Sequence, residues 1–270
     1  MNKGNDVLSV YKKIFDNMTW SYSRLKSYEN CPYSWYRRYI EDEEGEGSFY
    51  ADNGKAMHTV LDELIKGKLS INDAPSRYLE LFDDIATTVK QDIMDNTYDA
   101  CVEYLCDLSE DVLDGYHVVG SEIKANYEIG GYSFVGFIDL LLQDDDDNLI
   151  IVDHKSSAPF LKKDGKPKAS TKEQFDGYMK QMYLYSEAVY QMTGEYPKKL
   201  VFHHFKDNGK LTVVDFNEAD RHDAVFWALC TINKIYQDEE FVAVPKTGFC
   251  YRLCDYRYDC IYTKEEEDEV

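Results

Sequence analysis

Leu149-Ile150-Ile151-Val152-Asp153-His154-Lys155 is the stretch that decides the fold. Its four apolar residues predict a buried strand that ends in charged side chains. A similar apolar run, residues 137–142, precedes it, and the acidic run from Asp144 to Asp147 between them predicts a hairpin turn. Asp139 interrupts the earlier run, so antiparallel pairing of the two strands can bring Asp139 close to Asp153.

The rest of the chain predicts helices and further strands around this hairpin. A helix is expected to begin at Asn53-Gly54-Lys55-Ala56, and residues 75–113 predict two more helices. The pattern predicts strands at 117–129, 132–142, 149–155, 199–206 and 211–216, with helices at 173–194 and 218–236. This order predicts an α/β fold with a central mixed β-sheet flanked by helices.

The length of 270 residues suits one large domain or two small ones. We expect a single domain over residues 1–262, because no internal repeat or Ser/Gly linker marks a second one. Within it we expect a helical insertion at 70–115 and a cysteine-bearing segment at 246–262. An acidic tail follows at 263–270.

The chain is strongly acidic, with 30 basic against 51 acidic residues and a net charge of −21. This charge argues against non-specific coating of nucleic acid but allows a local basic groove. There is no apolar run long enough to span a membrane, and the N-terminus lacks the pattern of a signal peptide. We therefore expect a cytoplasmic protein without a membrane partner.

Alternate residues of a strand face the same side, so Asp153 and Lys155 should point together and His154 should point away. The backbone carbonyl of His154 could still reach a metal ion. Carboxylates such as Asp139 and Asp153 hold divalent cations, and a lysine can orient water or neutralise developing negative charge. The pattern favours metal-dependent hydrolysis of phosphodiesters, with a simple Asp–Lys salt bridge as the alternative.

Three further features accompany these residues. His58 follows Gly54 and is expected near a helix start, where it is either a ligand or structural. Gln181 and Tyr185 share one helix face and could hydrogen-bond a phosphate or the lysine, unless Tyr185 is simply a core residue. Residues 155–172 hold six lysines and one aspartate, which suits a phosphate backbone, although a solvated surface loop is the alternative.

Together these residues resemble the RecB-type branch of the PD-(D/E)XK nuclease superfamily, whose core is restriction-endonuclease-like. The resemblance extends to the small iron–sulfur exonucleases of CRISPR and phage systems and to the nuclease domain of AddB. The motifs that carry it, in order, are Ser21-Tyr22-Ser23-Arg24-Leu25, Cys31-Pro32, Gly54 to His58, Gly136 to Asp139, Asp153 to Lys155, Gln181 to Tyr185, and Cys250, Cys254 and Cys260.

The resemblance implies a role for each of these positions. It implies Mn²⁺ or Mg²⁺, with the nitrogen ligand favouring Mn²⁺. Lys155 becomes the catalytic lysine, and Gln181 and Tyr185 support the active site. The implied metal ligands are His58, Asp139, Asp153 and the carbonyl of His154.

In the family, four cysteines hold a [4Fe–4S] cluster that joins the chain ends. Here they are Cys31, Cys250, Cys254 and Cys260, so the segment 246–262 is expected to close onto Cys31. Three residues separate Cys250 from Cys254, where two are more usual, so a structural Zn²⁺ site and unligated cysteines stay open as alternatives. Beside Cys31, four aromatic residues are expected to pack around the cluster rather than stack on bases: Tyr33, Trp35, Tyr36 and Tyr39.

From these features we expect a metal-dependent deoxyribonuclease, an exonuclease acting on single-stranded or frayed DNA ends. The alternative is a catalytically silent nuclease-fold subunit that binds DNA or assembles into a recombination, CRISPR or phage complex. RNA is a third possible substrate, because no residue pattern here indicates recognition of a 2′-hydroxyl.

Overall fold

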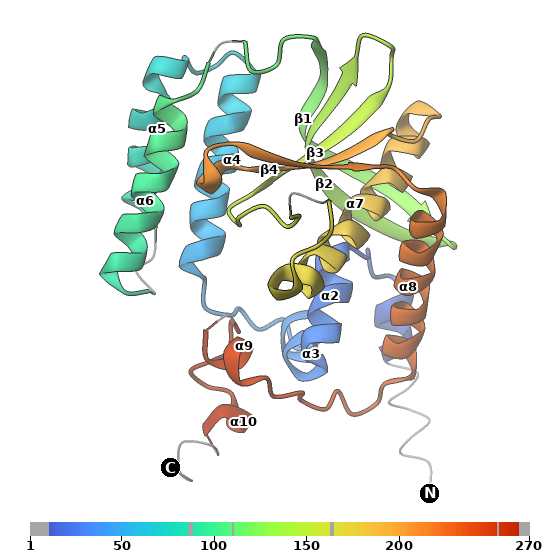
Figure 1. Ribbon diagram of the computed structural model, residues 1–270. Helices are drawn as coiled ribbons and strands as arrows, with labels where there is room; N and C mark the ends of the chain where they lie inside the picture. Colours follow the sequence, from blue (N-terminus) through green and yellow to red (C-terminus); the bar gives the residue numbers. More distant parts are fainter. Residues whose placement is uncertain (1–10, 86–88, 110, 163–164, 253, 265–270) are drawn as a thin grey trace, which may run out of the picture. The chain divides into compact units, whose positions relative to one another are not determined.

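The computed structural model describes residues 11–85, 89–109, 111–162, 165–252 and 254–264 (Figure 1). Its helices and strands are α2 (Tyr22–Asn30), α3 (Pro32–Tyr39), α4 (Phe49–Ile65), α5 (Ala74–Phe82), α6 (Gln91–Cys106), β1 (Tyr116–Ile129), β2 (Tyr132–Asp144), β3 (Leu149–Lys155), α7 (Lys172–Thr193), β4 (Lys199–His204), β5 (Lys210–Asp215), α8 (Glu218–Gln237), α9 (Thr247–Arg252) and α10 (Ile261–Lys264). Most of the expected acidic tail lies outside the described residues.

The chain divides into two compact units. We call Phe49–Tyr127 with Gly136–His222 the sheet unit, and Met1–Ser48, Glu128–Val135 and Asp223–Val270 the terminal unit. The expectation of a single domain over residues 1–262 stays a prediction about how the chain folds.

Five strands form one sheet in the order β1-β2-β3-β4-β5. Strand β2 pairs antiparallel with β3, β3 pairs parallel with β4, and β4 pairs antiparallel with β5. Strand β3 is a central strand of the sheet, and six of its seven residues are buried, as its apolar run predicted. The predicted mixed sheet with flanking helices is confirmed.

Two tight turns set the register of the first three strands. Gly130 and Gly131 both adopt positive φ, of 58° and 84°, which glycine tolerates in the turn between β1 and β2. In the turn between β2 and β3, Asp144 Oδ1 accepts the N–H groups of Asp146 and Asn148. This acidic run is therefore a turn whose leading aspartate is used by the backbone.

Helix α4 begins at Phe49 and not near Asn53, so the predicted helix start was wrong. Asn53 lies inside the helix with its side chain buried, and it accepts a hydrogen bond of 2.6 Å from the Tyr78 hydroxyl. The Asn53 side chain therefore forms a hydrogen bond in the core and does not cap the helix. The added N-terminal turn places His58 in mid-helix.

Helices α4, α5 and α6 stand side by side in the sheet unit (Figure 1). They share a core that includes Phe49, Met57, Tyr78, Cys101 and Leu105. The two helices predicted within residues 75–113 are thus α5 and α6, and they pack against the face of α4 that carries Met57, next to His58 in the chain.

In the terminal unit, Trp35 of α3 stacks on Phe241 with ring centroids 5.6 Å apart. The backbone N–H of Trp20 donates to the Ser133 carbonyl, and the backbone N–H of Val135 donates to the Trp20 carbonyl. The region predicted as cysteine-bearing loop also contains the short helices α9 and α10. Across the described part of the chain, no helix is both long and apolar enough to cross a membrane.

Candidate metal and active site

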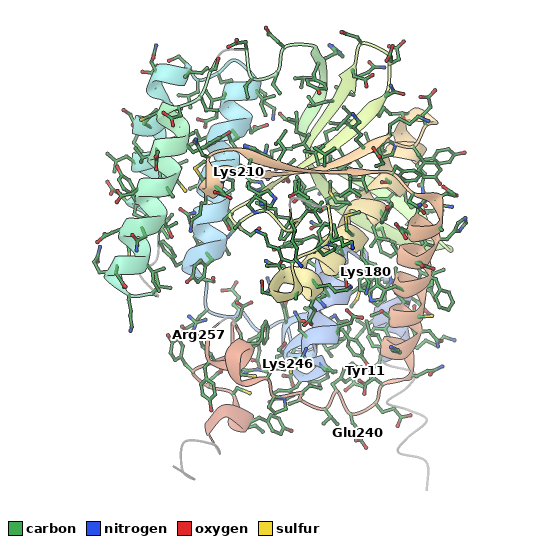
Figure 2. All side chains as sticks on the ribbon, in the orientation of Figure 1. Tyr11, Lys180, Lys210, Glu240, Lys246 and Arg257 are labelled. Carbon is green, nitrogen blue, oxygen red and sulfur yellow. The ribbon has the colours of Figure 1, made fainter. Side chains whose placement is uncertain are left out.

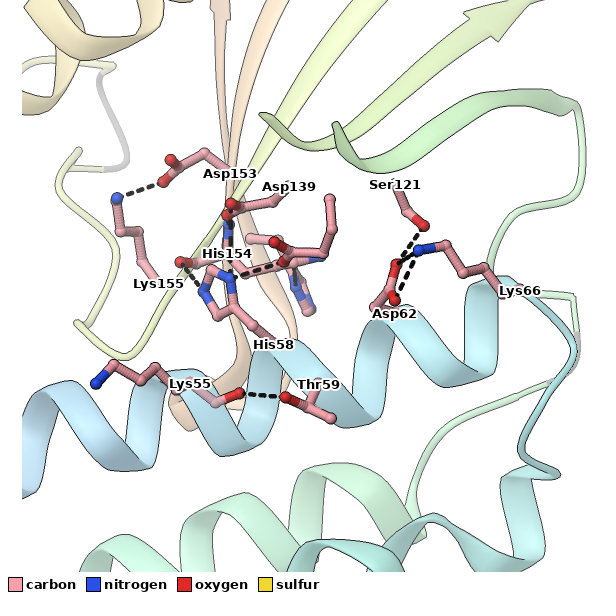
Figure 3. A network of polar contacts seen from close by, with 12 residues as sticks. Lys55, His58, Thr59, Asp62, Lys66, Ser121, Asp139, Asp153, His154 and Lys155 are labelled. Atoms are coloured by element: carbon pink, nitrogen blue, oxygen red, sulfur yellow. Dashed lines mark hydrogen bonds and ion pairs between the residues drawn. The ribbon is translucent and has the colours of Figure 1, made fainter. Parts of the chain in front are cut away.

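The pairing of β2 with β3 stops just before the two predicted carboxylates. Paired register runs from Gln143 with Leu149 to Leu140 with Val152. Beyond it, the Asp139 carboxylate replaces a backbone partner, and its Oδ2 accepts the His154 N–H at 2.7 Å. Asp139 and Asp153 are both buried there (Figure 3).

Asp139 is held close to a second buried negative charge. Burial, with the charge of Asp153 added, raises the pKa of Asp139 to about 7. Two ionised carboxylates are unfavourable in such a site unless a cation lies between or beside them. The pair therefore has the electrostatics of a cation-binding site.

His58 projects from α4 toward the same carboxylates (Figure 3). Its Nδ1 lies 3.2 Å from Glu122 Oε1 and 3.6 Å from Asp139 Oδ1, and its Nε2 lies 3.2 Å from the carbonyl oxygen of His154. Burial opposes the charged imidazole, but Glu122, Asp139 and Asp153 outweigh it and raise the pKa of His58 to about 9. In this arrangement both ring nitrogens face oxygen atoms.

Glu122 is a member of the site that sequence reasoning missed. One ligand atom from each of His58, Glu122 and Asp139 lies within 4.8 Å of the other two. Glu122 sits in mid-strand on β1 with a φ of 47°, a left-handed conformation that costs a non-glycine residue about 1–2 kcal/mol. Such strain concentrates at functional sites. A lone glutamate in a strand gives no sequence signal, because only the fold brings β1 against α4.

Asp62, one turn beyond His58 on α4, makes the neighbouring contact with β1. Its Oδ1 accepts a hydrogen bond of 2.5 Å from the Ser121 hydroxyl, and Lys66 pairs with the same carboxylate (Figure 3). His58 and Asp62 thus contact the adjacent residues Glu122 and Ser121. This double contact fixes α4 against β1 at the site.

Asp153 and Lys155 point to the same side, as their spacing predicted. Lys155 Nζ forms an ion pair with Asp153 Oδ2 at 2.5 Å. Among the described residues, no group donates a hydrogen bond of regular geometry to this oxygen. The ammonium also lies 4.0 Å from the centre of the Tyr178 ring. Burial opposes the charge of Lys155, but the nearby carboxylate of Asp153 prevails and raises the lysine pKa.

Gln181 and Tyr185 extend this contact along α7. Lys155 Nζ lies 3.4 Å from Gln181 Oε1, and Gln181 Nε2 donates to the Tyr185 hydroxyl at 2.9 Å. A Cβ at Gly136 would lie 2.8 Å from the Tyr185 ring, so the glycine of the Gly136–Asp139 motif makes room for that ring. Burial raises the pKa of Tyr185 to about 12, so its hydroxyl keeps its proton.

The side chain of His154 points away from the carboxylates, as predicted. Its Nδ1 lies 2.8 Å from His203 Nδ1 on β4. Burial, with the neighbouring histidines and Lys155 adding to it, places the pKa of His154 well below its usual value. Only the backbone of His154 faces the site.

The lysine-rich segment after β3 folds back on itself. Leu161 bridges Pro167, and the Lys168 N–H donates to the Phe160 carbonyl. Phe160 is fully buried against Phe175, Tyr178, Phe202 and His204. Lys162 and Lys166 are exposed on this lysine hairpin, residues 160–168, while Lys163 and Asp164 lie outside the described residues.

A second constellation lies in the terminal unit, where one pocket is lined by Cys31, Cys250, Cys254 and Cys260. We call it the cysteine pocket. No three of these sulfurs come within 4.8 Å of one another in the described structure. Burial raises the pKa of Cys254 to about 11, and the three other cysteines add to the effect. The Lys246 N–H donates to Cys250 Sγ at 3.2 Å, close to the Lys246 label of Figure 2.

Ion pairs fix the C-terminal part of the cysteine pocket to α3. Arg37 donates to both carboxylate oxygens of Asp259, at 3.1 and 2.6 Å, and also to Glu43. Arg38 pairs with Asp255 at 2.9 Å. Beside Cys31, Trp35 stacks on Phe241 and Tyr33 lies edge-to-face against Tyr262, and the packing of these rings around a cluster stays a prediction.

The family model for the PD-(D/E)XK nuclease superfamily matches residues 19–260, which include every motif residue described above. The chain belongs to the PD-(D/E)XK nuclease superfamily. The predicted family is confirmed, and with it a nuclease whose family uses divalent metals and DNA. No curated protein matches this PD-(D/E)XK nuclease.

One of two similar solved structures supports the fold of this PD-(D/E)XK nuclease. A protein from Eubacterium rectale, described as “Putative exonuclease”, is 14% identical with a TM-score of 0.54, over 92% of this chain and 87% of the other. A protein described as SSO0001 is 15% identical with a TM-score of 0.39, over 96% of each chain. The first likeness supports the fold, and no inference rests on the second.

Proposed function

We propose that this PD-(D/E)XK nuclease is a Mn²⁺- or Mg²⁺-dependent deoxyribonuclease that degrades single-stranded or frayed DNA from an end. The observation that carries the proposal is the meeting of His58, Glu122 and Asp139 within 4.8 Å, beside the Asp153–Lys155 pair. The resemblance to exonucleases supports the choice of DNA ends as substrate.

The donor set fits a divalent cation. Glu122, Asp139 and Asp153 are three carboxylates against the single ammonium of Lys155, so two negative charges remain when His58 is neutral. Oxygen ligands with one imidazole suit Mn²⁺ or Mg²⁺. We propose His58, Glu122, Asp139, Asp153 and the His154 carbonyl as the ligands. A bound cation would supply Lewis-acid stabilisation of the phosphate and lower the pKa of a coordinated water.

Lys155 is proposed as the catalytic lysine. Its raised pKa keeps it cationic, so it can stabilise the negative charge that develops on the phosphate and orient the attacking water. Gln181 holds the ammonium from one side and Tyr185 holds the amide, which limits the positions that Lys155 can adopt. These contacts are consistent with the role proposed for Gln181 and Tyr185, which is to position Lys155.

The lysine hairpin is proposed to bind the phosphate backbone of the substrate strand. It directly follows Lys155 in the chain, and its base is fixed by the buried ring of Phe160, which touches the same Tyr178 ring as Lys155. Its lysines stand out in a chain with a net charge of −21. Local positive charge next to the site would admit one strand while the acidic remainder repels non-specific contacts.

The cysteine pocket is proposed to hold a structural [4Fe–4S] cluster. A tetrahedral zinc ion, with Zn–S bonds of about 2.3 Å, draws its sulfurs to about 3.8 Å from one another. Among the described residues no three of these sulfurs lie within 4.8 Å of one another, so the pocket suits a larger cluster core better than a single zinc ion. No electron is needed for hydrolysis, so the proposed role is to hold the chain ends together.

The nuclease proposal is tested with purified protein, Mn²⁺, and oligonucleotides labelled at the 5′ or the 3′ end. Wild type should shorten the strand progressively from one end, and Lys155→Ala and Asp153→Ala should not. If both variants cut as well as wild type, the assigned site is wrong. Inactivity with every divalent metal, with DNA binding preserved, would support the silent-subunit alternative, and faster cleavage of RNA would change the substrate.

The cluster is tested on protein purified without oxygen. Brown protein with about four irons per chain is the expected result. Colourless protein with one zinc per chain would contradict the iron–sulfur assignment and support the zinc alternative.

A further inference from the structure

Two histidines, the buried His154 and the half-buried His203, form a pair behind the candidate metal site. The parallel register of β3 and β4 sets His154 directly opposite His203, so both side chains leave the sheet on the same face. Their Nδ1 atoms are 2.8 Å apart. Hydrogen bonding at this distance requires one Nδ1 to carry a hydrogen and the other to offer its lone pair, so the two rings hold opposite tautomers.

The ring of His203 has little freedom to move. It packs against the Tyr104 ring of α6 with centroids 5.2 Å apart. Gly209, on the turn between β4 and β5, leaves space for these two rings. A Cβ at this position would lie 2.9 Å from Tyr104 and 3.6 Å from His203. A ring held this way gives His154 a fixed partner.

The backbone of His154, by contrast, faces the candidate ligands. Its N–H donates to Asp139 Oδ2 at 2.7 Å, and its carbonyl oxygen lies 3.2 Å from His58 Nε2 (Figure 3). Rotation of His154 about its backbone would therefore move a hydrogen bond of Asp139 and a contact of His58 together. A hydrogen bond to the His154 side chain would restrain that rotation.

We propose that His203 is a positioning residue for the metal site: its hydrogen bond to His154 sets the direction in which the His154 carbonyl and N–H point. The inference rests on the proposed metal-dependent function. Hydrogen-bond partners that orient metal ligands typically change metal affinity 10–100-fold when removed, so His203 should matter to binding although it touches no ligand side chain.

His204, the next residue on β4, offers a matched control. It is also buried, and its ring makes two hydrogen bonds, to the Ser157 carbonyl at 2.6 Å and the Thr212 hydroxyl at 2.9 Å. Because it points to the opposite face of the sheet, its bonds secure the strands and the following loop. Losing them should cost stability without turning the His154 peptide.

The test measures Mn²⁺ binding to metal-free protein by titration calorimetry, without DNA, in wild type and three variants. His203→Phe keeps the ring volume but loses the bond and should weaken Mn²⁺ binding about 10–100-fold. His203→Asn offers an amide near the position of Nδ1 and should restore binding to within about threefold. His204→Phe should lower the melting temperature but keep the affinity of wild type.

Each outcome separates this inference from the proposed function. Wild-type affinity in His203→Phe would overturn the positioning role and leave the metal site standing. Equal weakening in His203→Phe, His203→Asn and His204→Phe would mean general loss of structure and would also overturn it. Absence of any Mn²⁺ binding by wild type would overturn the metal site and the positioning role together.

Discussion

The candidate metal site and the cysteine pocket hold their ligands in different ways. In the metal site, strands and the mid-point of a helix place His58, Glu122 and Asp139, and each of these side chains already has a protein partner. In the cysteine pocket, Cys31 meets Cys250 across 219 positions of sequence, with α9 and α10 as short helices nearby. The first is built by sheet register and the second by closure of the chain.

The difference predicts different consequences for loss of a ligand. Removal of a metal ligand leaves the sheet and its hydrophobic core intact, so chemistry should suffer more than folding. Removal of a cysteine would release the loop of more than two hundred residues that the proposed cluster closes, and that closure restricts the unfolded chain. The pocket should therefore contribute to stability and the metal site to catalysis.

The largest expected effect is that of Asp139→Asn on cleavage. The variant keeps the size of the side chain but removes a proposed ligand, so the rate should fall about 10³-fold. Its melting temperature should hold or rise, because the substitution removes a buried carboxylate whose pKa is raised to about 7. Cleavage assays and melting curves measure both effects. A large drop in melting temperature with normal cleavage would mean that Asp139 contributes to stability and not to catalysis.

Cys31→Ser should produce the opposite pattern. Loss of the proposed cluster should lower the free energy of unfolding by about 3–5 kcal/mol, in the range of other covalent links that close long loops. Mn²⁺ affinity of the folded protein should stay near that of wild type. Urea unfolding, iron content and calorimetry test this, with Cys106→Ser as the control because Cys106 is exposed. Equal stability of both variants would remove the proposed role of the pocket.

Mn²⁺ affinity of metal-free protein should rise with pH between 7 and 9. A metal must displace the proton of His58, whose pKa is about 9 in the metal-free site, so each unit below 9 weakens binding about tenfold. Because half of His58 is still protonated at pH 9, binding should be about 50-fold weaker at pH 7 than at pH 9. Titrations in oxygen-free buffer measure the slope, and a flat profile would exclude His58 as a ligand.

Glu122→Gln should weaken Mn²⁺ binding about tenfold, because it removes one charge from the proposed donor set. Asp62→Asn is the matched control, since Asp62 contacts the adjacent Ser121 from the same helix. It should change stability slightly and leave affinity unchanged. Wild-type affinity in Glu122→Gln would mean that Glu122 is not a metal ligand and that its left-handed conformation is a feature of the strand alone.

The smallest effect expected is that of the lysine hairpin on DNA binding. Lys162→Gln with Lys166→Gln should raise KM and reduce the slope of log affinity against log salt by about 1.4, with kcat unchanged. Lys124→Gln with Lys210→Gln, two exposed lysines elsewhere in the sheet unit, is the control, and Lys210 is labelled in Figure 2. Identical slopes for both double variants would show that the hairpin is only a surface loop.

Sequence patterns predicted the strands, the hairpin turn and the directions of Asp153, His154 and Lys155, because apolar alternation and turn chemistry are local properties. The start of α4 was misplaced, since the partner that buries Asn53 is Tyr78, on another helix. Local patterns say nothing about which helix a side chain will meet.

The sequence by itself determined the kinds of residue available: a carboxylate in each of two consecutive strands, a lysine beside one of them, a histidine and four cysteines near the chain ends. Only the tertiary structure decided which of them meet. It brought Glu122 to His58 and set His203 opposite His154, because a β1 contact with α4 and the register of β3 with β4 join residues that are far apart in the chain.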